Sequence, residues 1–138
     1  ADYPDPSEIE THGRRVKQIA YHVSGRGGPG YKEAVYHFLL AEALRRAGAD
    51  VLVKVRFSVE FDSIKLANVG EVDLIVNGHL IVELKATETF HPVHRLQVLS
   101  YLKATRLPLG LLVNFGAPRM KDGYNRIVQS GYQQVSEG

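Results

Sequence analysis

The sequence predicts an α/β domain in which a central mixed β-sheet is flanked by α-helices. Two observations favour this class: two helical segments precede the strands and a third interrupts them, and the apolar runs change from helical spacing to strand patterns. The expected order is helix, helix, three strands, helix, strand, with a further short strand near 126–128; helices packed on the faces of a mixed sheet follow from it. The crossover from strand 79–85 through helix 92–105 to strand 109–115 should be right-handed and parallel.

Capping signals and apolar periodicity predict the helices. The first begins at Pro6 with Asp5 as N-cap and continues to about Val23, where the glycine-rich run 25–30 ends it. That run could cradle phosphate, but its spacing matches no nucleotide-binding loop, and a flexible connection between helices is the favoured interpretation. The second helix runs from about Tyr31 to Ala47. Its expected apolar stripe is Ala34, Val35, Phe38, Leu39, Leu44 and Ala47, and the third helix should turn Val93, Leu96, Leu99 and Leu102 inward.

Strand signals occupy the middle of the chain. Residues 51–61 alternate between apolar and polar positions, whereas 109–115 are wholly apolar and therefore typical of a central strand. After a turn around Asp62-Ser63, a further strand leads to Asn77-Gly78, a dipeptide typical of tight hairpin turns.

Three ionisable residues interrupt the apolar runs on either side of this hairpin: Asp73, Glu83 and Lys85. Charged groups inside such runs are costly to desolvate unless they are paired or bind a metal ion. Carboxylate oxygens suit a hard cation such as Mg²⁺ or Mn²⁺, and a neighbouring lysine suits an anionic substrate. The pattern therefore outlines a metal-dependent phosphodiesterase site.

The Glu83-Leu84-Lys85 segment by itself has a second interpretation. Two charged residues at alternate positions could form the solvated face of an edge strand, where lysine also discourages pairing with another chain. Residues 80–82 are apolar without alternation, which is typical of a strand buried on both faces. Together with Asp73 on the partner strand, this favours the site.

The length of the hairpin turn decides whether the three charges meet. Glu83 and Lys85 are two residues apart and share a face of the sheet. A two-residue turn would pair Asp73 with Val82 and leave the aspartate on the opposite face.

We therefore predict a turn of odd length. A type I turn over 76–78, with Gly78 left-handed as a G1 bulge, pairs Asp73 with Ile81 and places all three charges on one side. Glu71 would share that side as an auxiliary carboxylate.

Composition places few limits on function. The chain has 138 residues, 44% hydrophobic and 23% charged, as is usual for one globular domain. We expect a single domain over 1–128 and a polar C-terminal tail over 129–138. Seventeen basic and fifteen acidic residues give a net charge of +2, which permits a polyanionic partner without requiring one. There is no cysteine, no apolar stretch long enough to span a bilayer and no signal-peptide pattern, so a cytoplasmic location without membrane contact is expected.

A family pattern is present at residues 30–36, Gly-Tyr-Lys-Glu-Ala-Val-Tyr, which match the Gly-x-x-Glu-x-x-Tyr motif of the GxxExxY proteins. The likeness continues through Asp73, 81–86, 92–94, Gln97, 101–103 and 110–116, and covers about 6–128. On these motifs the chain resembles the GxxExxY proteins, which belong to the PD-(D/E)XK nuclease superfamily. The resemblance implies a restriction-endonuclease-like core and cleavage of nucleic acid with Mg²⁺ or Mn²⁺.

The resemblance also implies roles for single residues. Asp73 and Glu83 would be metal ligands, and Lys85 would orient or polarise the attacking water and the phosphate. Glu33 resembles an additional acidic ligand, although a carboxylate in the first turn of a helix is also favoured by the helix dipole alone.

Gln97 and Tyr101 resemble a Gln-x-x-x-Tyr element that contacts the phosphate or the catalytic lysine. One departure is Glu71, which stands where relatives often carry a basic residue.

The function we expect is that of a Mg²⁺-dependent nuclease, with DNA favoured over RNA as substrate. The alternative is a non-catalytic module that keeps the fold and binds nucleic acid or a protein partner. Candidate phosphate contacts include Arg26, Arg95 and Lys121, although scattered cations are also typical of an ordinary solvated face.

Overall fold

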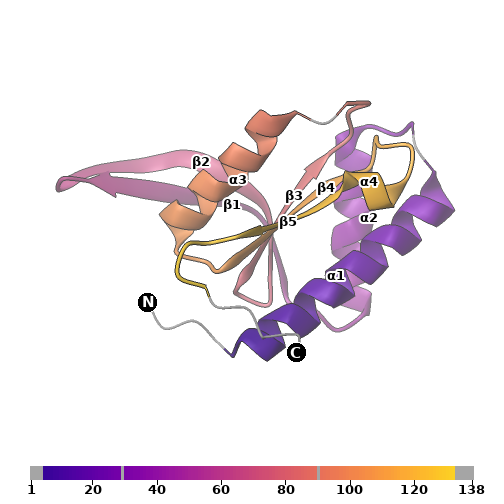
Figure 1. The fold of residues 1–138 in the computed structure, drawn as a ribbon, viewed down its shortest axis with the longest axis horizontal. Coiled ribbons are helices and arrows are strands. Elements are labelled where there is room, and N and C mark those ends of the chain that lie inside the picture. Colours follow the sequence, from indigo (N-terminus) through magenta and orange to yellow (C-terminus); the bar gives the residue numbers. More distant parts are fainter. Residues whose placement is uncertain (1–4, 29, 90, 133–138) are drawn as a thin grey trace.

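The structure is a computed structural model, and it describes residues 5–28, 30–89 and 91–132. Helix α3 covers one face of a five-stranded sheet, and α1 and α2 cover the other (Figure 1). The predicted α/β class, with helices on both faces of a mixed sheet, is confirmed. The elements in chain order are α1 (Pro6–Gly27), α2 (Glu33–Arg46), β1 (Val51–Phe61), β2 (Ile64–Val76), β3 (Leu80–Lys85), α3 (Pro92–Thr105), β4 (Leu109–Asn114), α4 (Met120–Gly123) and β5 (Tyr124–Val128).

The strands lie in the order β1-β2-β3-β4-β5. Strands β3 and β4 are parallel, as the β3-α3-β4 crossover requires, and the other neighbours are antiparallel. Every residue of β4 is buried, as predicted for its apolar sequence, and the polar Asn114 at its end is buried with it. The sheet therefore separates two apolar clusters, one under α1 and α2 and one under α3.

Helix α1 extends further than predicted. Its N-terminus is as expected, since the Asp5 side chain accepts a hydrogen bond from Ser7 N–H at 2.9 Å. The helix continues through the first glycines of the run and ends at Gly27, with Gly28 as its C-cap, whose φ of 69° favours glycine.

Helix α2 buries Leu44 as predicted, but the rest of its buried face differs from the predicted stripe. Val35, Phe38 and Leu39 are exposed, whereas Tyr36 and Leu40 are buried. Two apolar stripes lie side by side on this helix, and periodicity alone cannot choose between them. The choice comes from tertiary packing against the sheet, in which the Tyr36 ring takes part.

Helix α3 is likewise rotated from the expected orientation. Leu102 is buried and Leu99 packs against the core, as predicted, but Val93 and Leu96 are exposed and Val98 is buried instead. A Cβ built on Gly110 of β4 would lie 2.6 Å from Cγ1 of Val98, so the missing side chain lets the helix approach the strand there.

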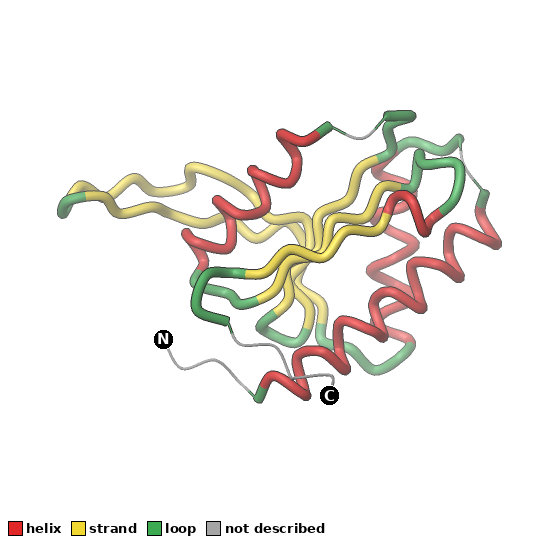
Figure 2. The backbone as a smooth tube through the Cα atoms, in the orientation of Figure 1, coloured by secondary structure: helices red, strands yellow, loops and turns green. Residues whose placement is uncertain are grey.

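Strands β1 and β2 continue beyond the sheet as a two-stranded ribbon, the arm, which we define as residues 58–69 (Figure 2). Its turn at Asp62-Ser63 has positive φ at both residues, 47° and 67°, as in a type I′ turn. Phe61 and Ile64 face each other across this turn and are 73% and 62% exposed. The arm thus presents apolar side chains to solvent.

The packed part of the chain continues past residue 128. Gln129 N–H donates to Pro108 O at 2.9 Å, and the buried Tyr132 donates its hydroxyl to Glu10. The start of the predicted polar tail is therefore part of the folded body, and its remainder, 133–138, lies outside the described residues. Within the described part of the chain, no helix combines the length and apolarity needed to cross a membrane.

Candidate active site

The hairpin between β2 and β3 has a loop of odd length, as predicted, but a different register. Asn77, Gly78 and His79 form the loop, and Val76 faces Leu80. Asn77 and Gly78 have φ of 51° and 74°, and His79 N–H donates to Val76 O at 3.3 Å. These features are typical of a type I′ turn followed by one extra residue, because asparagine tolerates the left-handed region that the predicted type I turn reserved for glycine.

The shift changes the partner of the aspartate. Leu74 pairs with Val82 and Ile75 with Ile81, so Asp73 falls opposite Glu83 rather than opposite Ile81 as predicted. Residues opposite each other share a face, and the two carboxylates therefore lie on the same side of the sheet.

The backbone of Asp73 is paired with neither of the neighbouring strands, β1 and β3. Its N–H donates to Glu83 Oε1 at 2.7 Å, and its Oδ2 accepts from Leu84 N–H at 2.9 Å. Its carbonyl oxygen lies 3.1 Å from His37 Nε2 of α2, and the β1–β2 pairing skips Lys54, which has a φ of 51°. Side chains thus replace the strand partners of Asp73, and the sheet opens at the candidate site.

Glu83 is buried beside another acid. Glu83 is only 4% exposed. This burial, followed by the charge of Asp73, raises the pKa of Glu83 to about 8. The hydrogen bond from Asp73 N–H and the charge of Lys85 act in the opposite direction. When no metal ion is bound, the carboxyl group of Glu83 is therefore protonated at neutral pH.

Glu33 joins the site through charge. It is the first residue of α2, and desolvation, followed by the charge of Asp73, raises its pKa, while Lys85 and His37 lower it. No hydrogen bond links its carboxylate to another described residue. Glu33 is therefore within electrostatic reach of Asp73 and Lys85 but is not held against them.

The Gly-x-x-Glu-x-x-Tyr motif has a physical explanation here. Gly30 has a φ of 110°, which favours glycine, and Glu33 follows at the start of α2. The Tyr36 hydroxyl donates to Gly28 O at 2.5 Å and accepts from Tyr31 N–H at 3.2 Å. The tyrosine thus ties the loop before α2 to the helix that presents Glu33.

Helix α3 brings Tyr101 to the acidic cluster but leaves Gln97 apart. Burial raises the pKa of Tyr101, and the carboxylates of Glu83, Asp73 and Glu71 raise it further, in that order. Gln97 is exposed and forms no hydrogen bond with a described residue. Glu71 is also exposed, opposite Arg56 in the β1–β2 ladder.

Lys85 is held by the strand and loop around it. It pairs with Asn114 of β4. The buried Asn114 side chain accepts from Thr87 N–H at 3.0 Å and from Gly116 N–H at 2.9 Å, and donates to Thr87 O at 2.9 Å. Asn114 therefore fixes the course of the chain directly after Lys85.

The candidate phosphate contacts lie on separate elements. Arg26 is in the last turn of α1, Arg95 is on α3 and Lys121 is on α4, and all three are exposed. None forms an ion pair with a described residue. The structure does not gather them into one patch.

Sequence reasoning missed His37 and Asn114, because neither interrupts an apolar pattern in a way that signals chemistry. A signal for His37 existed: it stands four residues after Glu33 on the same helix, so the two side chains share a face.

The donor set suits a hard cation without forming a complete metal site. Among the described residues, no three His, Cys, Asp or Glu side chains lie close enough together to hold a metal ion. Asp73 Oδ2 and Glu83 Oε1 each accept a hydrogen bond from a backbone N–H, and a side-chain hydrogen bond between the two carboxyl groups also raises the pKa of Glu83. Two neighbouring carboxyl groups, of which Asp73 raises the pKa of Glu83, are the kind of oxygen ligands that fit a divalent cation.

Comparisons with known proteins bear on the fold and the family. One solved structure with the same fold, described as "Crystal structure of SSO0001", superposes with a TM-score of 0.54 at 19% sequence identity. The match covers 96% of this chain and 64% of that one, so the present chain spans less than two thirds of that protein. A comparison with curated proteins found no match. A family model of the PD-(D/E)XK nuclease superfamily matches residues 10–127, nearly the whole of the described chain, and the protein belongs to that superfamily.

Proposed function

We propose that this chain is a divalent-metal-dependent nuclease that hydrolyses phosphodiester bonds, in DNA rather than RNA, with Mg²⁺ or Mn²⁺ as cofactor. One observation carries the proposal: the carboxyl groups of Asp73 and Glu83 meet at the same break in the sheet, where each accepts a backbone N–H and the two share a side-chain hydrogen bond. Within the described residues neither acid forms an ion pair with a lysine or arginine, and a divalent cation bound between them would compensate their charge.

The roles of the side chains follow from their positions. Asp73 and Glu83 would hold the cation, with Glu33 as the third acid at the start of α2. A divalent cation bound there lowers the pKa of a coordinated water and stabilises charge on a phosphate. Lys85, two residues after Glu83 on the same face, would orient the water and the scissile phosphate. Tyr101 would contact the phosphate from α3, with Gln97 one turn before it on the same helix.

We also infer that the chain belongs to the GxxExxY branch of the superfamily. The positive φ of Gly30, the place of Glu33 in the first turn of α2 and the two hydrogen bonds of Tyr36 give each residue of the motif a distinct structural task.

The test is a cleavage assay with labelled single-stranded and duplex DNA in Mg²⁺, Mn²⁺ or EDTA. Asp73→Asn and Glu83→Gln keep size and remove charge, and each should abolish cleavage, as should EDTA. Glu42→Gln is the matched control, because Glu42 lies on the surface in an exposed pair with Arg45. Thermal melting of each variant confirms that it is folded.

Three results would decide against the proposal. The first is undiminished cleavage by either carboxylate variant, which would remove the site. The second is cleavage that persists in EDTA, which would remove the cofactor. The third is DNA binding by the wild type with no cleavage in any metal, which would favour a non-catalytic nucleic-acid-binding module instead.

A further inference from the structure

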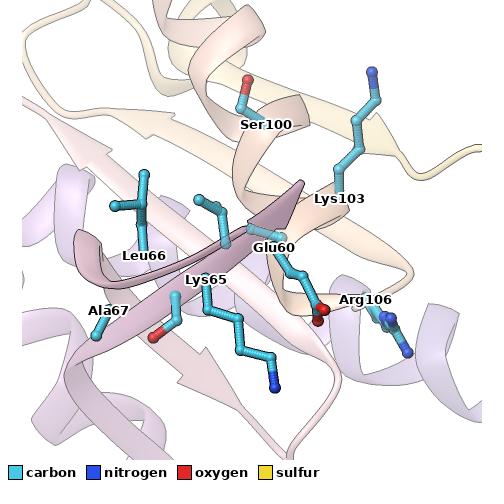
Figure 3. A pocket seen from close by; sticks show the side chains of 10 residues that line it. Glu60, Lys65, Leu66, Ala67, Ser100, Lys103 and Arg106 are labelled. Atoms are coloured by element: carbon cyan, nitrogen blue, oxygen red, sulfur yellow. The ribbon is translucent and has the colours of Figure 1, made fainter. Parts of the chain in front are cut away.

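A groove of about 790 Å³ lies between the arm and helix α3, away from the acidic cluster (Figure 3). From the arm it is lined by Ser58, Val59, Glu60, Lys65, Leu66 and Ala67, and from α3 and the residue after it by Ser100, Lys103, Ala104 and Arg106. A volume of this size is typical of ligand-binding clefts.

The walls of the groove differ in chemistry. On the arm, Val59 lies opposite Leu66 and Phe61 opposite Ile64, so these four apolar side chains share one face. Leu66 is 56% exposed and Phe61 is 73% exposed. An exposed apolar face beside polar and charged walls suits a ligand that has both flat apolar parts and charge.

The charge of the groove is positive. Lys65, Lys103 and Arg106 outnumber the single acid, Glu60, and none of these cations forms an ion pair with another described residue. Glu60 and Lys65 face each other across the arm and alternate with Val59 and Leu66, so they lie on the other face of the arm, and in Figure 3 Lys65 extends away from Ser100 and Lys103. The cations beside the apolar wall are therefore Lys103 and Arg106.

Arg106 occupies a position that normally suits glycine. It caps the C-terminus of α3 with a φ of 59° and a ψ of 30°, in the left-handed region. For a residue with a Cβ this conformation is unfavourable by about 1 kcal/mol. Strain of this kind is typical of positions where the side chain has a task, here at the rim of the groove.

A ring contact near the groove involves a residue of the candidate active site. Phe57 directly precedes Ser58, Tyr101 directly follows Ser100, and their rings pack with centroids 5.0 Å apart. Tyr101 also lies within electrostatic reach of Glu83 and Asp73. Tyr101 therefore lies within reach of the acidic cluster and directly follows a residue that lines the groove.

We propose that the groove between the arm and α3 binds single-stranded nucleic acid, with phosphates on Lys103 and Arg106 and bases on the apolar face of the arm. Single strands combine an anionic backbone with exposed base faces, and proteins that bind them join cationic grooves to aromatic or apolar platforms. A duplex keeps its base faces stacked inside. The proposal rests on the nuclease function for its biological meaning, since it names the form of the substrate.

The experiment measures binding without cleavage. Fluorescence anisotropy of a labelled oligodeoxythymidine of about 15 nucleotides is followed in EDTA, with a duplex of equal length in parallel. Lys103→Ala and Arg106→Gly should each weaken single-strand binding severalfold and reduce the slope of log affinity against log salt by about 0.7. Arg106→Gly also relieves the left-handed strain, so loss of folding cannot explain its effect.

Three further variants separate the contributions. Glu60→Gln should strengthen binding, because it removes the one acid of the groove. Phe61→Ser should weaken binding about fivefold or more without changing the salt slope, because it removes a stacking surface and no charge. Arg46→Ala is the control cation, since Arg46 is exposed in the last turn of α2 on the other face of the sheet.

Unchanged affinity in a Lys103→Ala, Arg106→Gly double variant would overturn the proposal. Duplex binding that is as tight as single-strand binding, and equally weakened by these variants, would overturn its single-strand part. Because the readout is binding in EDTA, it does not depend on turnover: a wild type that binds through the groove but never cleaves would remove the nuclease function and leave the groove assigned.

Discussion

His37 Nε2 lies 3.1 Å from the backbone carbonyl oxygen of Asp73. A carbonyl only accepts hydrogen bonds, so the imidazole is the donor. This bond takes the place of a strand partner, because the β1–β2 pairing skips Asp73. It ties helix α2, which begins with Glu33, to the residue that we propose as a metal ligand. His37 is therefore a positioning residue for Asp73.

We expect His37→Ala to lower the rate of single-turnover cleavage about tenfold or more, because a small displacement of a reacting group has effects of that order. Oligonucleotide affinity in EDTA should stay unchanged. His37→Gln, whose amide can donate to the same carbonyl, should recover part of the rate. The control is His22→Ala, an exposed position on α1. A cleavage rate in His37→Ala equal to that of the control would show that the bond has no role in positioning.

The raised pKa of Glu83 predicts how stability depends on pH when no metal is present. Its pKa is about 8 in the folded protein and near 4.5 in the unfolded chain. The neutral form is favoured by folding, so this stabilising contribution is full below pH 4.5 and is lost as the pH rises through 8. His79 has the opposite effect on the pH dependence of stability. Burial lowers its pKa, so its contribution to stability is lost as the pH falls.

A comparison with Glu83→Gln isolates the carboxyl group, because the histidines are common to both proteins. In EDTA, the melting temperature of Glu83→Gln should exceed that of the wild type by several degrees at pH 9, and the gap should close as the pH falls to 5. Adding Mg²⁺ at pH 9 should raise the melting temperature of the wild type alone. Parallel pH profiles for the two proteins in EDTA would show that Glu83 titrates normally and is not desolvated.

The sequence was sufficient to place the charged residues on one face but not to find their register. The three-residue loop follows from the need to put Asp73 beside Glu83, and its parity is correct. Its position is one residue later than predicted, since Asn77 adopts the left-handed conformation together with Gly78. Tight turns that differ by one residue have similar local energies, and tertiary contacts of the strands select among them.

The buried faces of the helices could be predicted only in part from the sequence, for a related reason. Helix α2 carries two adjacent apolar stripes, and the structure buries the one that contains Tyr36 and leaves Phe38 exposed. The deciding contacts involve residues far away in sequence, such as Phe115, whose ring stacks on Tyr36 with centroids 4.6 Å apart. Periodicity carries no information about such partners.

The contribution of the Tyr36 hydroxyl to the stability of the fold can be measured by removing this group alone. Tyr36→Phe keeps the ring on Phe115 and removes the bonds to Gly28 O and Tyr31 N–H. We expect a loss of about 1–3 kcal/mol in the free energy of unfolding, because Gly28 O loses a partner near the protein interior. Urea denaturation measures it, with Tyr31→Phe, an exposed ring, as the control. An equal, small effect in both variants would mean that the hydroxyl does not anchor the loop.

Gly116 lies against the backbone of Thr87, in the segment that follows Lys85, so a larger residue at position 116 should disturb this segment. A Cβ at Gly116 would lie 2.4 Å from the carbonyl oxygen and 2.5 Å from the nitrogen of Thr87. Both are backbone atoms, and Asn114 fixes them by hydrogen bonds, so they cannot turn aside as a flexible side chain would. The clash must displace the segment that begins two residues after the proposed catalytic lysine.

Gly116→Ala should therefore destabilise the protein by about 1–3 kcal/mol and slow cleavage, because the displaced loop carries Lys85 with it. The matched control is Gly25→Ala. A Cβ there meets nothing within 4 Å, and Gly25 lies within helix α1. Alanine at that position should stabilise by about 0.4–1 kcal/mol, since it reduces the freedom of the unfolded chain and favours the helix. Urea denaturation and the cleavage assay give the two readouts. Equal effects of the two glycine replacements, of either sign, would show that Thr87 does not press against residue 116 and that the course of the chain after Lys85 is not fixed there.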